Sequence, residues 1–198
     1  ELDIIVIYEG LNDLSGELRD VAAKQHVIAD ARVQELSWPA NYSLLWNLAE
    51  KNLRVISSQR AARQNQDRLT IDASTLGEQY RKDLTELVRE AQKSAKLVAV
   101  VTLAIQVRRE QSAEQQANAL SSAIYFMPFI TPNAFIESVA RYNQVVSEVA
   151  RETGALLIEG EDAIPGDSVH FNDTVHFTDA GSRAMAERVG RALIPRIA

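Results

Sequence analysis

The 198-residue sequence contains no cysteine and has no apolar run close to the length of a membrane span. Without cysteine, neither a disulfide nor a cysteine-ligated zinc site can form. A helix needs about 18 consecutive apolar residues to cross a bilayer, and no stretch approaches that length. We therefore expect no disulfide framework, no cysteine-based metal site and no membrane span within these residues.

An excess of positive charge is also missing. The formal net charge is −6 and the isoelectric point is near 5.2. This balance argues against a nucleic acid or an anionic membrane bound mainly by electrostatic attraction. No internal repeat, low-complexity tract or linker divides the chain, and 46% of its residues are hydrophobic. The sequence thus predicts a single domain over residues 1–198 with a substantial core.

Short apolar runs alternate with helical patterns along the chain. The runs, rich in β-branched residues and typical of buried parallel strands, cover residues 2–8, 96–103 and 155–158. Amphipathic periodicity and residues typical of helix ends predict helices over residues 14–33, 76–95, 135–153 and 179–193. Strands that alternate with helices predict a parallel sheet covered on both faces, a three-layer α/β/α sandwich. Helical inserts are expected over about 35–76 and 105–134.

The first insert carries an apolar and aromatic stripe. Its members recur at helical spacing: Tyr42, Leu45, Trp46, Ala49 and Leu53. Such a stripe usually packs in a core, and this is the expected arrangement. The alternative is a wall or lid over a substrate pocket, since large inserts that follow a strand often serve function.

A possible acid–base pair lies near the C-terminus. Asp173 and His176 are three residues apart in a short loop before the last predicted helix. A carboxylate that accepts from one imidazole nitrogen leaves the other nitrogen free as a general base. The alternative is an ordinary surface hydrogen bond, because the spacing alone is a weak signal.

A second motif follows the first predicted strand. Gly10, Asn12 and Asp13 lie directly after it, where the carboxyl end of a parallel strand presents its ligand-binding residues. The Asn12 amide can donate to a developing oxyanion. The competing interpretation is that Asn12 caps the next helix.

Together, the two motifs resemble those of the SGNH (GDSL-type) hydrolases. Gly10, Asn12 and Asp13 match that family's third block, and Asp173 and His176 match its fifth block. The resemblance implies a flavodoxin-like parallel sheet and a serine esterase that cleaves O-acyl esters of carbohydrates, lipids or small alcohols without a cofactor. It also implies that His176 is the general base, that Asp173 orients it, and that Asn12 belongs to the oxyanion hole. Gly10 and Asp13 would shape the turn.

The family's nucleophile block and second block have no counterpart here. The resemblance therefore implies an N-terminally truncated domain that lacks its first two strands, with an exposed sheet edge and little activity by itself. Gly166-Asp167-Ser168 spells the nucleophile motif, but it follows Pro165 in a loop and is better explained as a turn. We do not expect Ser168 to be the nucleophile.

Other functions remain open at this stage. The chain could be a non-catalytic, degenerate module of the same fold, or an O-acyltransferase that uses the same acyl-enzyme step. It could also be an unrelated flavodoxin-like binding domain. Glu159, Glu161 and Asp162 follow the third strand, but acidic loops are mostly solvated, and no metal site is expected there.

Overall fold

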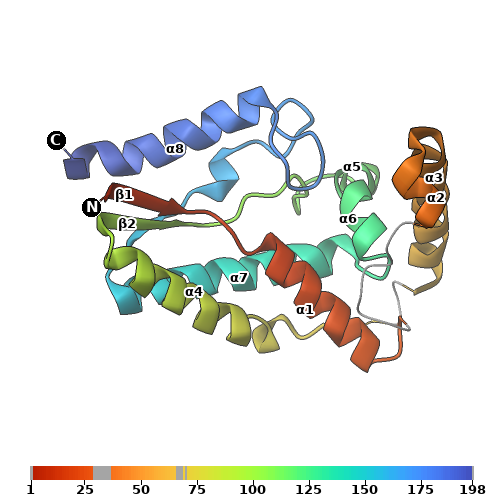
Figure 1. Ribbon diagram of the computed structural model, residues 1–198, viewed down its shortest axis with the longest axis horizontal. Helices are drawn as coiled ribbons and strands as arrows, with labels where there is room; N and C mark the ends of the chain where they lie inside the picture. Colours follow the sequence, from red (N-terminus) through yellow and green to blue (C-terminus); the bar gives the residue numbers. More distant parts are fainter. Residues whose placement is uncertain (1, 29–36, 66–68, 70, 198) are drawn as a thin grey trace.

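A parallel three-stranded sheet organises the molecule (Figure 1). The computed structural model describes residues 2–28, 37–65, 69 and 71–197. The strands are β1 (Leu2–Ile7), β2 (Ala95–Val101) and β3 (Leu156–Ile158), in the order β1-β2-β3. Both strand pairs are parallel. The α/β class and all three predicted strands are confirmed.

The helices follow the strands in the predicted alternation. They are α1 (Leu11–Lys24), α2 (Trp38–Tyr42), α3 (Leu44–Asn65), α4 (Glu78–Gln92), α5 (Ala113–Ala119), α6 (Ser121–Phe126), α7 (Pro132–Thr153) and α8 (Asp179–Ile197). Two short 3-10 turns, η2 (Ala73–Thr75) and η3 (Glu161–Ala163), complete the list. Helix α7 has clear end signals, since Thr131 accepts from the Ala134 N–H and Gly154 adopts a left-handed conformation.

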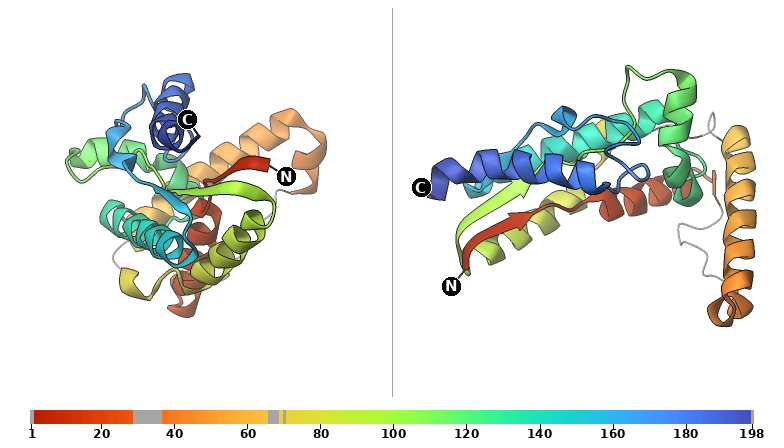
Figure 2. Two further views of the ribbon diagram at one scale, coloured as in Figure 1. Left: turned by 90° about the vertical axis from the view of Figure 1, so that its left-hand side faces the viewer. Right: turned by 90° about the horizontal axis from the view of Figure 1, so that it is seen from above.

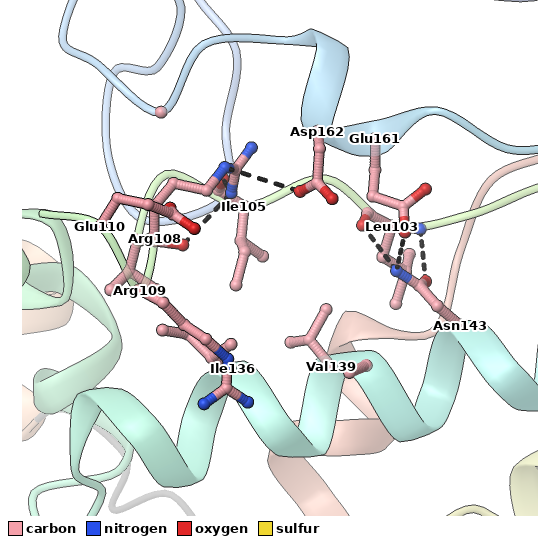
Figure 3. A pocket seen from close by; sticks show the side chains of 13 residues that line it. Leu103, Ile105, Arg108, Arg109, Glu110, Ile136, Val139, Asn143, Glu161 and Asp162 are labelled. Carbon is pink, nitrogen blue, oxygen red and sulfur yellow. Dashed lines mark hydrogen bonds and ion pairs between the residues drawn. The ribbon is translucent and has the colours of Figure 1, made fainter.

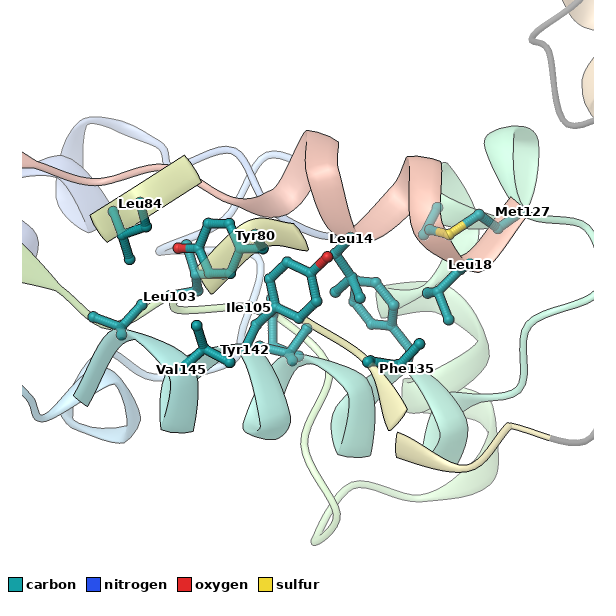
Figure 4. Close-up of a cluster of buried hydrophobic side chains, with 14 of the residues drawn as sticks. Leu14, Leu18, Tyr80, Leu84, Leu103, Ile105, Met127, Phe135, Tyr142 and Val145 are labelled. Carbon is teal, nitrogen blue, oxygen red and sulfur yellow. The ribbon is translucent and has the colours of Figure 1, made fainter. Parts of the chain in front are cut away.

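The larger core lies between the sheet and helices α1, α4 and α7 (Figure 4). Leu14 and Leu18 of α1 are fully buried, and the rings of Tyr80 and Tyr142 stack with centroids 4.5 Å apart. On the opposite face, α8 covers Ala99 and other residues of β2 and β3 (Figure 2). Helices therefore lie on both faces of the sheet.

Strand β1 forms one edge of the sheet among the described residues. Val6 pairs in register with Ala99, yet Val6 is 41% exposed whereas Ala99 is fully buried. Leu2 is 55% exposed. Helix α8 thus covers the centre of this face and leaves the apolar side of β1 open, an uncommon edge for an isolated domain.

The first predicted helix is wrong in its extent. Helix α1 begins at Leu11 and ends at Lys24. The chain then leaves helical geometry, with Gln25 at the C-cap and His26 at a positive φ of 57°. Residues 29–33 of the prediction lie outside the described part of the chain.

The prediction that the aromatic stripe packs in the core is also wrong. Tyr42 is 78% exposed, Leu45 80% and Trp46 54%. Helix α3 lies across one end of the molecule, away from the sheet (Figure 2). Helical periodicity identified residues that share a segment, but α2 and α6, which contact α3, leave these side chains exposed.

Candidate functional site

Asp173 and His176 are in contact in the loop that precedes α8. The Nδ1 atom of His176 lies 2.8 Å from Asp173 Oδ2 and 3.0 Å from Oδ1. The His176 side chain is 76% exposed and that of Asp173 34%. When Nδ1 carries the proton shared with the carboxylate, Nε2 retains a lone pair that can accept a proton. The structure thus brings the two side chains together, as their spacing predicts.

Local backbone geometry creates this pair. Asp173 Oδ1 accepts from the backbone N–H groups of Val175 and His176, both at 2.9 Å, which closes a tight Asx-type turn. Burial raises the pKa of the Asp173 carboxyl, but its hydrogen bonds to Val175 and His176 outweigh burial and leave the pKa below its ordinary value. The carboxylate is therefore ionised at neutral pH and can stabilise a charged imidazole.

Thr174 attaches this turn to the body of the protein and is only 1% exposed. Its hydroxyl donates to the Ala119 carbonyl at 2.7 Å and accepts from Ser122 Oγ at 2.8 Å. Its own carbonyl accepts from the Gln106 N–H at 2.8 Å. The turn is thereby fixed to α5, α6 and the segment that follows β2.

Close backbone packing sets the position of the turn against α8. Phe171 and Phe177 form an antiparallel bridge that encloses the pair, and their rings lie 5.0 Å apart. Gly181, in the first turn of α8, packs against the His170 carbonyl. A Cβ at Gly181 would lie 1.9 Å from that oxygen. Only glycine permits this approach without displacing the loop or the helix.

A second turn with the same construction precedes the first. Asp167 Oδ1 accepts from the N–H groups of Val169 and His170, both at 3.0 Å, and contacts His170 Nδ1 at 2.7 Å. The hydrogen bond from the His170 side chain lowers the pKa of the Asp167 carboxyl. Burial raises this pKa, but by less, so the pKa stays below its ordinary value. Sequence analysis predicted a turn at Gly166-Asp167-Ser168 but missed the pairing of Asp167 with His170. The signal was present, because Asp-Ser-Val-His and Asp-Thr-Val-His recur six positions apart.

Gly166, Asp167 and Ser168 belong to this second turn and do not open a helix. A Cβ at Gly166 would lie 2.3 Å from the Gln106 carbonyl oxygen. Gln111 Nε2 donates to the Gly166 carbonyl at 2.6 Å. Ser168 itself is exposed. Close packing against Gln106 thus explains why residue 166 is a glycine, and the Asx turn explains why residue 167 is an aspartate. Neither explanation requires Ser168 to be a nucleophile.

Gly10 and Asn12 lie at the start of α1. Gly10 has a φ of 123°, and a Cβ there would lie 2.7 Å from Tyr80 Oη. Asn12 is exposed and stands inside the first turn of the helix. The alternative prediction that Asn12 caps the helix is wrong, because Gly10 holds the cap position and no side chain caps it. Asp13 also lies in this first turn, where a carboxylate complements the helix dipole.

Tyr8 connects the end of β1 to the loop that carries His176. Its ring stacks on Phe177 with centroids 6.3 Å apart and an interplanar angle of 20°. Its hydroxyl accepts from the Ala104 N–H at 3.2 Å. The start of α1, which contains Asn12, and the loop before α8, which contains His176, both lie at the carboxyl edge of the sheet (Figure 1).

Asn12 also lines a pocket of about 690 Å³ between α1, α4 and α7. Beside it, burial raises the pKa of Glu9 to about 7, helped by the charge and hydrogen bond of Asp13 and by the charge of Asp83. A carboxyl with this pKa can exchange protons near neutral pH. Sequence reasoning missed Glu9, whose only signal was its position between the first strand and Gly10.

A further pocket of about 560 Å³ lies beyond the carboxyl ends of β2 and β3 (Figure 3). Asn143 holds one wall in place, accepting from the Leu103 N–H at 2.7 Å and donating to the Leu103 carbonyl at 3.0 Å. Glu161, predicted to be solvated, instead accepts from Asn143 Nδ2 at 3.1 Å and Thr102 Oγ1 at 2.5 Å. Neither of these two pockets is lined by Asp173 or His176.

Two kinds of feature are absent from the part of the chain that the structure describes. No group of three or more histidine, aspartate or glutamate side chains is arranged to hold a metal ion. Among the same residues, no helix is both long and apolar enough to cross a membrane.

Comparison with known proteins gives no assignment. No family model, no curated protein and no solved structure matches the chain.

Proposed function

We propose that this chain supplies the general base and part of the oxyanion hole of a serine ester hydrolase of the SGNH type. His176 is the base, Asp173 orients it, and Asn12 donates to the oxyanion. The observation that carries the proposal is the Asp173–His176 pair, in which Nδ1 is held by an ionised carboxylate while the ring is 76% exposed. An exposed imidazole with a fixed tautomer is the arrangement that general-base catalysis requires.

In the proposed reaction, His176 Nε2 takes the proton of a serine hydroxyl as the serine oxygen attacks the carbonyl carbon of an O-acyl ester. Asp173 stabilises the resulting imidazolium. Asn12 donates to the tetrahedral oxyanion, an interaction worth about 2.7–4 kcal/mol per donor. His176 then protonates the departing alcohol, and water hydrolyses the acyl-enzyme by the reverse sequence of proton transfers.

The proposal places the nucleophilic serine on a segment outside these 198 residues. Strand β1 is an edge of the sheet among the described residues, so its unpaired backbone side can receive an additional parallel strand; the exposed Leu2 and Val6 lie on the face that α8 leaves open. In a flavodoxin-like three-layer sandwich, such a strand would end beside Tyr8 and so deliver its following residue near His176. Gly10 would then hold the first turn of α1 at the same edge.

One observation favours a second function. The Asp167–His170 turn has the same hydrogen bonds as the Asp173–His176 turn. A repeated turn of this kind can serve structure alone, since its aspartate satisfies two backbone N–H groups in either case. A non-catalytic module of the same fold is therefore the competing proposal.

The two proposals are separated by an esterase assay. The 198-residue chain and a version extended upstream in the coding sequence would be incubated with p-nitrophenyl acetate and with a serine-directed fluorophosphonate. We expect hydrolysis and labelling of the extended chain only, with the label on an upstream serine by mass spectrometry. Ser168→Ala, as the control, should leave both unchanged. A label on Ser168 would contradict the assigned nucleophile, and an inactive extended chain would favour the non-catalytic module.

A further inference from the structure

The strongest unexplained surface lies on residues 37–65, which contain α2 and α3 and are called the arm below. Of the 14 exposed large hydrophobic side chains in the described residues, eight lie in this arm. They are Trp38, Tyr42, Leu44, Leu45, Trp46, Leu48, Leu53 and Ile56. Single exposed apolar residues are ordinary, but a concentration of this size marks a surface that binds something.

The first turns of α3 also show an unusual distribution of polar and apolar side chains. In α3 the shielded side chains include a charged pair, Glu50 and Arg54, with side chains only 16% and 23% exposed and an ion pair of 2.6 Å. Leu45 and Leu48, one turn apart, are 80% and 51% exposed. A helix in water normally turns its polar side outward. The arrangement in α3 fits a helix whose outer side meets an apolar medium.

The charge of the arm differs from that of the whole chain. Residues 37–65 contain one acidic residue, Glu50, and four basic ones, a local net charge of +3 in a chain of −6. The whole-chain value hides this local excess. Basic residues together with tryptophan, tyrosine and leucine are typical of helices that lie at a phospholipid surface. A protein partner would explain the apolar residues but has no need of this charge.

The position of the arm suits contact with a flat surface. Helix α3 lies across one end of the molecule, and the sheet and α8 extend away from it (Figure 2). A plane laid against this end would meet α3 along its length before reaching the body. The tilted ring pair of Trp38 and Tyr42, 5.1 Å apart, lies on the neighbouring α2 at the same end.

We propose that the arm docks the protein onto a phospholipid bilayer surface, with α2 and α3 lying in the interface. The apolar side chains of α3 enter the headgroup region, and the basic residues favour anionic lipid. This inference does not depend on the proposed esterase function, because it rests on exposed residues of the arm alone.

Tryptophan fluorescence tests the proposal directly. Trp38 and Trp46 are the only tryptophans in the sequence, so intrinsic emission reports on the arm alone. The protein would be titrated with vesicles of phosphatidylcholine, with and without phosphatidylglycerol, and binding confirmed by flotation. We expect the emission to move to shorter wavelength with both kinds of vesicle. The shift should occur at a lower lipid concentration when phosphatidylglycerol is present.

Matched variants sharpen the test. Leu45→Glu should weaken partitioning by about tenfold or more, the loss expected for one leucine that no longer leaves water. Leu87→Glu makes the same change at a 46% exposed leucine of α4 and should alter partitioning by less than about twofold. Arg60→Gln should weaken binding only to the anionic vesicles, by about fivefold. Far-UV circular dichroism would confirm that each variant is folded.

Three outcomes would contradict the proposal. The first is unchanged emission and no flotation with either kind of vesicle. The second is a shift that occurs without lipid as protein concentration rises, with a doubling of mass in sedimentation, because a second copy would then cover the arm. Equal loss of binding in Leu45→Glu and Leu87→Glu would also contradict a role specific to the arm.

Discussion

The Asp167–His170 and Asp173–His176 turns share a four-residue pattern and the same hydrogen bonds, but they differ in what surrounds them. The His170 side chain is 22% exposed and that of His176 is 76% exposed. In each turn the aspartate holds Nδ1 of its histidine. The short pattern thus determines the local geometry, whereas the surrounding fold determines whether the imidazole can reach a substrate.

The second residue of each turn accounts for part of the difference. Thr174 is buried and bonded to Ala119 and Ser122, so its turn is fixed to the helices of the second insert. Ser168 is exposed at the corresponding position. A catalytic base must be held within a fraction of an ångström of its working position. The buried threonine therefore favours the Asp173–His176 turn as the functional one.

Replacing each aspartate should give the largest contrast. In the proposed esterase formed by the extended chain, Asp173→Asn should lower kcat by about 10³–10⁴-fold, because the amide no longer holds the productive His176 tautomer. Asp167→Asn should change kcat by less than about twofold, which corresponds to under 0.5 kcal/mol. Steady-state hydrolysis of p-nitrophenyl acetate measures both. Similar losses in the two variants would remove the distinction between the turns.

Two glycines of α8 test how the turns depend on close packing. Gly181→Ala should lower the free energy of unfolding by about 1–3 kcal/mol, because its Cβ would meet the His170 carbonyl at 1.9 Å. Gly190→Ala is the matched change in the same helix. Its Cβ meets nothing within 4 Å, so alanine should stabilise the protein by about 0.5–1 kcal/mol. Urea denaturation measures the free energy of unfolding of both variants. Equal changes in the two variants would contradict the close contact between Gly181 and the His170 carbonyl.

Glu9 extends the comparison to a carboxyl whose pKa moves the opposite way. Its pKa rises from 4.5 in the unfolded chain to about 7 in the fold. The native state therefore holds a proton that the unfolded state releases, and stability falls as pH rises from about 4.5 to 7. Glu9→Gln should remove this fall and raise stability at pH 8 by on the order of 1–2 kcal/mol, less than the full shift corresponds to, because the half-buried carboxyl is partly screened by solvent. The free energy of unfolding of the parent protein and of Glu9→Gln at pH 5 and pH 8 tests this prediction. The same change between the two pH values in both proteins would contradict the raised pKa of Glu9.

The smallest effect concerns the two turn aspartates. Their lowered pKa values add stability that is present above the unfolded pKa of 3.8 and is lost as pH falls through the folded value. Asp167→Asn and Asp173→Asn should each remove less than about 1 kcal/mol at pH 7 and flatten the decline below about pH 4. The amide oxygen still accepts both backbone bonds, so the change keeps the turn while it removes the charge and weakens the contact with the histidine ring. The free energy of unfolding would be measured between pH 2 and pH 7. A decline at acid pH identical to that of the parent protein would contradict the lowered pKa values.

Local patterns were sufficient to predict much of the fold. The β-branched runs located all three strands, and periodicity located α4, α7 and α8 to within a few residues. The contact between Asp173 and His176 was also predictable, because a three-residue spacing closes within one turn. The stacked position of Tyr8 on Phe177 was not, since it depends on segments about 170 residues apart.

The failures share a physical cause, which is that a sequence pattern does not say what covers a surface. The stripe from Tyr42 to Leu53 has helical spacing, yet α3 lies away from the sheet and leaves those side chains exposed. Gly166 and Gly181 reflect contacts with Gln106 and His170 that only the folded chain creates. Likewise, the raised pKa of Glu9 requires the burial provided by the surrounding helices.

The most direct test of the account is fluorophosphonate labelling of the extended chain with one histidine replaced at a time. We expect His176→Ala to abolish labelling of the nucleophilic serine, because no base remains to activate it, and His170→Ala to be labelled at the parent rate. Labelling that survives His176→Ala, or that is lost in His170→Ala, would contradict the assignment of His176 as the catalytic base.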